Sequence, residues 1–275
     1  MFKDILLPLP TLPRAAGRAT LRRALEAARL MEAHVSGLVV EPSIPLPISF
    51  RPYGTELERQ LDARRAEARE AARAELAAFE DEARRAGLSH DGQIATVPDG
   101  TFDPVVEHAR LRGLTIAPFI GDDEIHADML QALIFESGRP VLLLPEDGGE
   151  SFRLGRVVLA WDFGRAAARA LADALPLLRQ AKDVRILTVL ADKQAPTSAS
   201  GAELIAHLAR NGVHATLHEI ERGRRAVAEV LDDAAEGADL LVMGAFGHSR
   251  IRDFFLGGAT RHMLAKPRLP TLLSH

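Results

Sequence analysis

The stretch PVLLLPEDGGESFRLGRVVLAWD, from Pro140 to Asp162, marks the point at which the pattern of the chain starts again. It opens with a short apolar run between two prolines, which is typical of a buried strand. The run EDGGES (Glu146–Ser151) follows and has the composition of a linker. A second apolar run, RVVLAWD, then matches the first strand-like run of the chain, DILLPLP (Asp4–Pro10). The sequence therefore indicates an internal duplication.

Apolar runs alternate with helical patterns on both sides of the linker. In the first part we expect strands at 4–10, 34–40, 91–97, 114–120 and 140–145, and helices at about 14–33, 55–85, from Pro104 onward, and 128–137. In the second part we expect strands at 156–162, 183–192, 214–220, 239–244 and 270–274, and helices at about 165–180, 200–212, 224–236 and 258–265.

This order predicts an α/β fold of two tandem open parallel five-stranded sheets with flanking helices. The domains are predicted at residues 1–147 and 152–275. The fifth runs of the two domains, PVLLLP and PTLLS, would each leave an exposed sheet edge if unpaired. We therefore expect the two domains to pack together through these strands, around a pseudo-two-fold axis.

Composition limits the classes of function. The chain has 275 residues, 47% of them hydrophobic, which is enough for one large core or two smaller ones. The formal net charge of −4 and the 5% of aromatic residues argue against a nucleic-acid partner. The sequence has no cysteine, which excludes disulfides and thiolate chemistry. No run suits a signal peptide or a membrane span, so a cytoplasmic protein without a membrane partner is expected.

The stretch VMGAFGHSRIRDFFLGGATRH (Val242–His262) is the main candidate for a binding site. Glycines that follow a strand and lead into a helix can turn backbone N–H groups toward a phosphate. Arg250 and Arg252 could neutralise phosphate charge. A Walker-type phosphate loop and the dinucleotide fingerprint are both missing from the sequence. From the residues alone, an anion site and a glycine-rich connector are both open.

The second half resembles a universal stress protein domain, and the whole chain resembles a tandem pair of such domains. The ATP-binding branch of that family has a glycine, two residues, a glycine, nine residues, a glycine and then Ser or Thr. This chain matches with Gly244, Gly247 and Gly257, but has Gly258 where the hydroxyl would stand. The resemblance implies the adenine nucleotide alpha hydrolase-like fold and an ATP ligand, which could bind with or without Mg²⁺.

The resemblance also implies the roles of single residues. It places Asp162 and the backbone of Val189 at the nucleoside. The phosphates would meet the glycines and nearby polar residues, namely Gly244, Gly247, His248, Arg250, Gly257, Gly258 and Thr260. Ordinary structural roles remain open: Asp162 as a helix cap, and Thr260 as a plain helix residue. A lost hydrogen bond to a charged group costs about 1.5–3 kcal/mol, so Gly258 should weaken ATP binding.

The first half lacks these features. Its first strand runs into PLPTLP, without an acid at the matching place, and only Gly121 remains of the glycine series. Asp122, Asp123 and Glu124 would repel phosphate, and fit an exposed loop that caps a helix better than a cation site. We expect the first half to be a degenerate copy without a nucleotide site.

No residue or motif in the sequence indicates catalysis. His214 and His218 share a face of a strand pattern without a carboxylate cluster, so a metal site is not expected. The sequence has no nucleophile elbow. We therefore expect an ATP-binding regulatory protein of the stress response in which any ATP hydrolysis is slow. The alternatives are an interaction scaffold without nucleotide, or a sensor or enzyme for another phosphorylated molecule. A homodimer and the identity of a protein partner stay open.

Overall fold

The computed structural model describes residues 2–11, 14–44, 55–98, 101–121, 123–147, 149, 151–190, 200–245 and 267–275, without the side chains of residues 55–57. Below, residues 1–147 are called the N-terminal half and residues 152–275 the C-terminal half. Among the described residues, no helix is long and apolar enough to cross a membrane.

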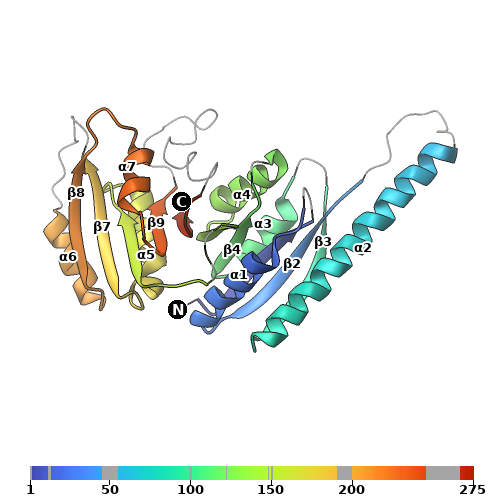
Figure 1. Cartoon of the computed structure of the whole chain (residues 1–275), viewed down its shortest axis with the longest axis horizontal. Helices are drawn as coiled ribbons and strands as arrows, with labels where there is room; N and C mark the ends of the chain where they lie inside the picture. The colour runs from blue at the N-terminus through green and yellow to red at the C-terminus, as the bar shows by residue number, and fades with distance from the viewer. Residues whose placement is uncertain are drawn as a thin grey trace.

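The two halves contain the same kinds of element in the same order as far as the fourth strand of each (Figure 1). The N-terminal half consists of β1 (Asp4–Pro10), α1 (Arg18–Leu30), β2 (His34–Pro42), α2 (Thr55–Arg85), β3 (His90–Val97), α3 (Asp103–Arg110), β4 (Leu114–Phe119), α4 (Glu124–Glu136) and β5 (Val141–Pro145). The C-terminal half consists of β6 (Arg156–Ala160), α5 (Arg165–Leu178), β7 (Asp183–Leu190), α6 (Gly201–Arg210), β8 (Ala215–Glu221), α7 (Val227–Ala234), β9 (Leu240–Gly244) and β10 (Thr271–Ser274). The helix expected at 258–265 lies outside the described residues.

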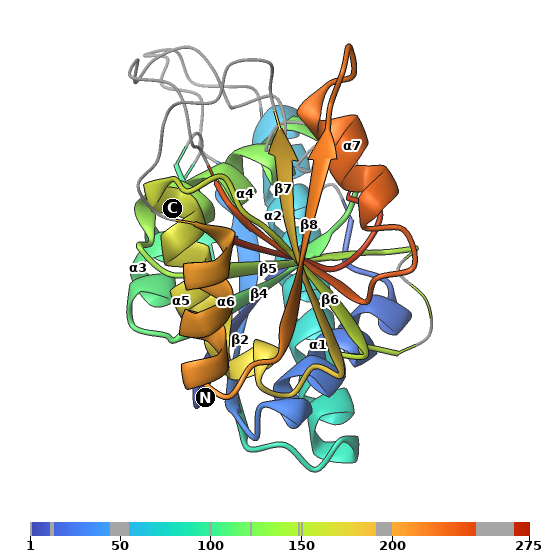
Figure 2. The same cartoon turned by 90° about the vertical axis from the view of Figure 1, so that its left-hand side faces the viewer.

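The two five-stranded sheets form one continuous sheet in the order β3-β2-β1-β4-β5-β10-β9-β6-β7-β8. Neighbouring strands are parallel within each half, while β5 and β10 pair antiparallel, with Thr271 opposite Leu143 and Leu273 opposite Val141. The predicted pairing through the fifth strands is therefore confirmed. The mirrored strand order around this antiparallel pair is what a local two-fold axis through the sheet produces. The strands rotate steadily along the sheet, as twisted sheets do (Figure 2).

Helices cover both faces of the sheet, so the central strands are mostly buried and apolar, while the edge strands β3 and β8 carry exposed polar residues. One core contains buried residues of α1, α2, α5 and α6, and the other those of α3, α4 and α7. The C-terminus adds a contact between the halves, since the ring of His275 packs edge-on against Phe135 of α4 at 5.2 Å.

Among the described elements, helix α2, with 31 residues, differs most from its counterpart in the other half, α6, with 10. Its second part packs on the sheet through Phe79, which is fully buried. A Cβ at Gly37 of β2 would lie 2.4 Å from the Phe79 ring, so glycine is required there for the ring to reach the strand. The first turns of α2 project away from the sheet (Figure 1).

The helix starts show how well local signals predict boundaries. Helix α2 spans 55–85 as expected. Helix α1 begins at Arg18 and not near residue 14, because Gly17 is extended with φ −61° and ψ 146°. The expected start of α4 at Asp128 is wrong. The helix begins at Glu124 because the Asp123 side chain accepts a hydrogen bond from the His126 N–H at 3.0 Å. Asp123 thus has the capping role that its sequence suggested, while Asp122 lies outside the described residues.

Candidate functional site

The site expected in the C-terminal half lies where the strand order reverses. Strands β7 and β8 continue the sheet from β6 in one direction, and β9 and β10 continue it in the other. In open parallel sheets the crevice beyond the carboxyl ends of the strands at such a point is the usual ligand site. Asp162 follows β6 and Gly244 ends β9, and these strands are direct neighbours. The fold therefore brings these two expected site residues to the ends of neighbouring strands, and the region beyond these strand ends is called the C-terminal crevice below.

Asp162 lies in a tight turn between β6 and α5. Its Oδ1 accepts a hydrogen bond from the Gly164 N–H at 2.8 Å, and α5 begins directly after Gly164. Phe163 has a φ of 60°, a left-handed conformation that costs free energy in a residue with a side chain. Its ring packs edge-on against Trp161 at 5.7 Å. The Asp162 carboxylate thus fixes the turn, and the residue is exposed.

Val189 lies near the end of β7 with its backbone toward the crevice. The Leu187 carbonyl accepts the Trp161 N–H at 2.8 Å, so the backbone groups of Leu187 face β6. Two residues further along a strand, the backbone faces the same side. The peptide groups of Val189 therefore point past the end of β6, while its half-buried side chain packs on the core. The backbone contact with a nucleoside that the family resemblance implies for Val189 stays a prediction.

Gly244 has a packing role in addition to its place at the crevice. A Cβ at this position would lie 2.4 Å from the Ala166 carbonyl carbon and 2.6 Å from the Ala167 nitrogen. These are backbone atoms in the first turn of α5, which cannot move aside like a flexible side chain. Gly244 therefore allows the N-terminus of α5 to lie directly against the end of β9.

Six of the expected site residues lie within 246–266, outside the part of the chain that the structure describes: Gly247, His248, Arg250, Gly257, Gly258 and Thr260. The expected phosphate contacts therefore stay predictions.

Two polar side chains near the ends of β6 and β7 were not singled out by the sequence analysis. Trp161 Nε1 and Thr188 Oγ1 are buried, and neither has a hydrogen-bond partner among the described residues. A buried donor without a partner costs about 1–3 kcal/mol, so each marks a position where a further polar group would stabilise the protein. The single Trp of the chain was a signal available in the sequence, but the positive φ of Phe163 beside it was not.

The N-terminal half differs at the matching positions. Strands β1 and β2 begin with Asp4 opposite His34, and β6 and β7 begin with Arg156 opposite Asp183. Counting the same number of residues along each chain segment from these first pairs, Pro10 is the counterpart of Asp162, and Val40 is the counterpart of Val189. Pro10 has no carboxylate.

Strand β1 also extends further than β6, so its end covers Val40. The Val40 carbonyl accepts the Thr11 N–H at 3.4 Å and the Thr11 hydroxyl at 3.0 Å. The Val40 carbonyl therefore already accepts hydrogen bonds from the chain itself.

A carboxylate of the chain itself, that of Glu146, lies at the N-terminus of α1 in the N-terminal half. The Glu146 carboxylate, at the end of β5, pairs with Arg14, whose Nη1 lies 2.7 Å from Glu146 Oε1. The same oxygen accepts the Gly17 N–H at the helix N-terminus at 3.4 Å. The hydrogen bond from Arg14 lowers the pKa of Glu146, although partial burial opposes this. The buried Arg23 donates to the Glu146 carbonyl at 2.9 Å, which anchors the linker to α1.

Comparisons with known proteins agree with this geometry. Residues 154–275 match the model of the universal stress protein family. A universal stress protein from Archaeoglobus fulgidus DSM 4304 superposes with a TM-score of 0.71 at 15% identity, over 98% of this chain and 97% of that one. A protein from Pseudomonas aeruginosa UCBPP-PA14, described as a candidate universal stress protein, gives a TM-score of 0.58 at 16% identity, over 99% and 93% of the two chains. Curated protein sequences gave no match.

The family match covers the half that contains the crevice, and the structural matches span both halves. The C-terminal half of the chain is therefore a universal stress protein domain, and the whole chain has the tandem fold of the universal stress protein family.

Proposed function

We propose that this protein binds an adenine nucleotide, ATP, at the crevice of its C-terminal half and acts as a regulatory protein of the stress response. The observation that carries the proposal is that Asp162 follows β6 and Gly244 ends the neighbouring strand β9, at the reversal of strand order and within the domain that matches the family. The glycine spacing from Gly244 to Gly257 supports the same ligand.

Each end of the nucleotide would meet a different part of the crevice. Asp162 is exposed beside the crevice and the Val189 backbone faces it, so both can meet the nucleoside. Gly247, Gly257 and Gly258 would offer N–H groups to the phosphates, and Arg250 a positive charge. Mg²⁺ bound to the triphosphate would reduce its charge. These residues are those of a binding site, and we assign none of them a catalytic role.

Calorimetry with ATP on the full chain tests the proposal. A β-branched side chain at Gly247 should block the approach of phosphate to the backbone, so Gly247→Val should abolish binding. Gly17→Val is a matched control, because a Cβ at Gly17 meets its nearest neighbour at an ordinary 3.7 Å and the residue lies in the other half. If Gly247→Val binds ATP as tightly as the parent does, the phosphates do not bind at this stretch.

A second pair of variants tests the nucleoside end. Asp162→Asn keeps an oxygen that can accept the Gly164 N–H, and Asp162→Ala removes it. If the carboxylate contacts the nucleoside, both variants should weaken ATP binding. If the residue only holds the turn, Asp162→Asn should bind ATP like the parent.

A further inference from the structure

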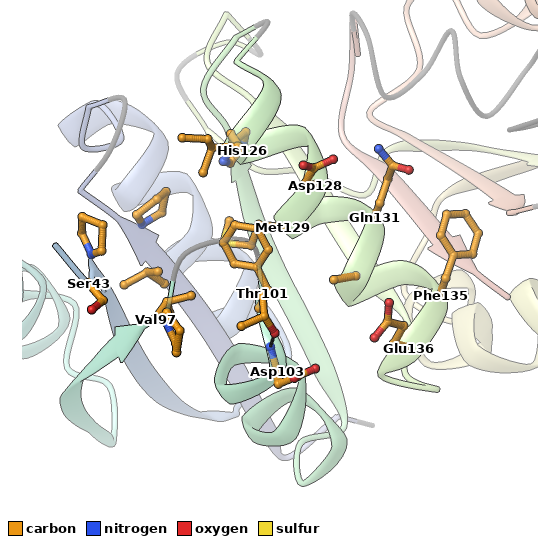
Figure 3. A pocket seen from close by; sticks show the side chains of 17 residues that line it. Ser43, Val97, Thr101, Asp103, His126, Asp128, Met129, Gln131, Phe135 and Glu136 are labelled. Atoms are coloured by element: carbon orange, nitrogen blue, oxygen red, sulfur yellow. Dashed lines mark hydrogen bonds between the residues drawn. The ribbon is translucent and has the colours of Figure 1, made fainter. Parts of the chain in front are cut away.

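A cavity of about 440 Å³ lies in the N-terminal half, at the place that corresponds to the nucleoside end of the C-terminal crevice. The carboxyl ends of β1, β2 and β3 contribute to its wall, together with α3 and α4 (Figure 3). Its volume is within the range of sites for small organic ligands, about 300–1,000 Å³. Pro10 and Val40, the counterparts of Asp162 and Val189, both line it.

Most of the lining is apolar. It includes Val40, Val97, Phe102, Met129 and Phe135, of which Val40, Val97 and Met129 are buried. Ile125 lies at the opening and is 56% exposed, which is unusual for a large aliphatic side chain. The walls therefore offer an apolar ligand both buried surface and two aromatic rings.

The charged groups of the lining are all acidic. Asp103, Asp128 and Glu136 line the cavity and are exposed, and none of the described lining residues is Lys or Arg. His126 is buried, and burial lowers its pKa, so its ring is neutral at pH 7. The described lining thus carries negative charge only, which disfavours a phosphate and favours a cation.

The placement of the carboxylates indicates the kind of cation. Figure 3 shows Asp103 on α3 and Asp128 and Glu136 on α4, spread around the cavity. Within the described part of the chain, no three acidic or histidine side chains come close enough together to hold a metal ion. A cation that also fills an apolar cavity is an organic one.

We propose that this cavity is a second ligand site, which binds a small amphipathic amine with its apolar body between α3 and α4 and its ammonium group at the acidic opening. The N-terminal half then has a ligand of its own, separate from the nucleotide of the C-terminal half. This inference does not depend on ATP binding.

Three probes of similar size and different charge test the proposal on the full chain: 2-phenylethylamine, 2-phenylethanol and 3-phenylpropanoate. Calorimetry at low salt should show the amine binding most tightly and the carboxylate most weakly. Added NaCl should reduce the difference, since exposed charges are screened. Equal binding of the amine and the carboxylate, or tighter binding of the carboxylate, would overturn the proposal.

Variants then separate the contribution of charge from that of the cavity. Asp128→Asn should weaken binding of the amine by about two- to fivefold, the effect of one exposed charge, and leave the alcohol unchanged. Glu107→Gln is the matched control, an exposed acid of α3 outside the cavity lining. Ala132→Phe should fill the cavity and abolish binding of all three probes. If Ala132→Phe binds the amine like the parent, or if ATP displaces the amine, this cavity is not the site.

Discussion

The contact between Gly244 and α5 gives the sharpest mutational test of the C-terminal half. Gly244→Ala adds one methyl group at a place where the nearest backbone atoms lie 2.4 Å and 2.6 Å away. Ordinary contacts between carbon atoms are about 3.5–4.0 Å. The first turn of α5 must therefore move away from β9 by roughly 1 Å.

The cost follows from what α5 buries. The helix packs on the sheet through Ala166, Ala167, Ala170, Leu171, Ala174, Leu177 and Leu178. Inserting a methyl group into such a close-packed layer costs about 1–3 kcal/mol. In a domain of this size, each kcal/mol lowers the Tm by about 2–4 °C. We therefore expect Gly244→Ala to lower the Tm of the C-terminal half by roughly 4–8 °C, for a cost of about 2 kcal/mol.

Differential scanning calorimetry of the full chain measures this change. Gly113→Ala is the control, because a Cβ at Gly113 would lie 3.4 Å from the Asp4 carbonyl oxygen, an ordinary contact. Gly113→Ala should leave the Tm almost unchanged. A Tm of Gly244→Ala equal to that of the parent would refute the close approach of α5 to the end of β9.

Three other predictions concern the linker, the phosphates and the joined halves. Removal of the Arg14–Glu146 pair by Arg14→Met should slightly lower the urea midpoint of unfolding at pH 7, since an exposed ion pair contributes little to stability. Because Arg14 lowers the folded-state pKa of Glu146, the pair stabilises the fold above the ordinary pKa of Glu, and the deficit should shrink below about pH 4; a deficit independent of pH would contradict this. Gly258→Ser should tighten ATP binding about tenfold, from the gain of one hydrogen bond to a charged group, and calorimetry that shows no gain would mean that another group already fills this role. Residues 152–275 expressed alone would expose the edge of β10, so light scattering should find a dimer or aggregate; a stable monomer would count against the importance of this pairing.

Much of the fold could be predicted from the sequence because its strands and helices have strong local signals. The alternation of apolar runs with amphipathic helices gave the order of elements, and the restart after the linker gave the duplication. Tertiary details were less accessible. The start of α4 depends on Asp123 bonding to the His126 N–H, and the extended conformation of Gly17 delays α1. Neither boundary follows from hydrophobic periodicity.

The candidate site was predictable only in part. Gly244 was selected from the glycine stretch and Asp162 through the family resemblance, and the fold brings them to the ends of neighbouring strands. The sequence did not show that Gly244 is also needed for packing against α5, since that contact joins residues far apart in the chain. Nor did it show the cavity of the N-terminal half, whose wall combines three strand ends and two helices. Such a cavity depends on how side chains of distant elements fill space.

The number of nucleotides bound by one chain is the most direct test of the central claim, that only the C-terminal half binds ATP. Native mass spectrometry and calorimetry of the full chain should both give one ATP per chain. The physical reason is that Pro10 stands where a carboxylate is needed, and Thr11 occupies the Val40 carbonyl in the N-terminal half. Two ATP molecules per chain, or none, would contradict the account.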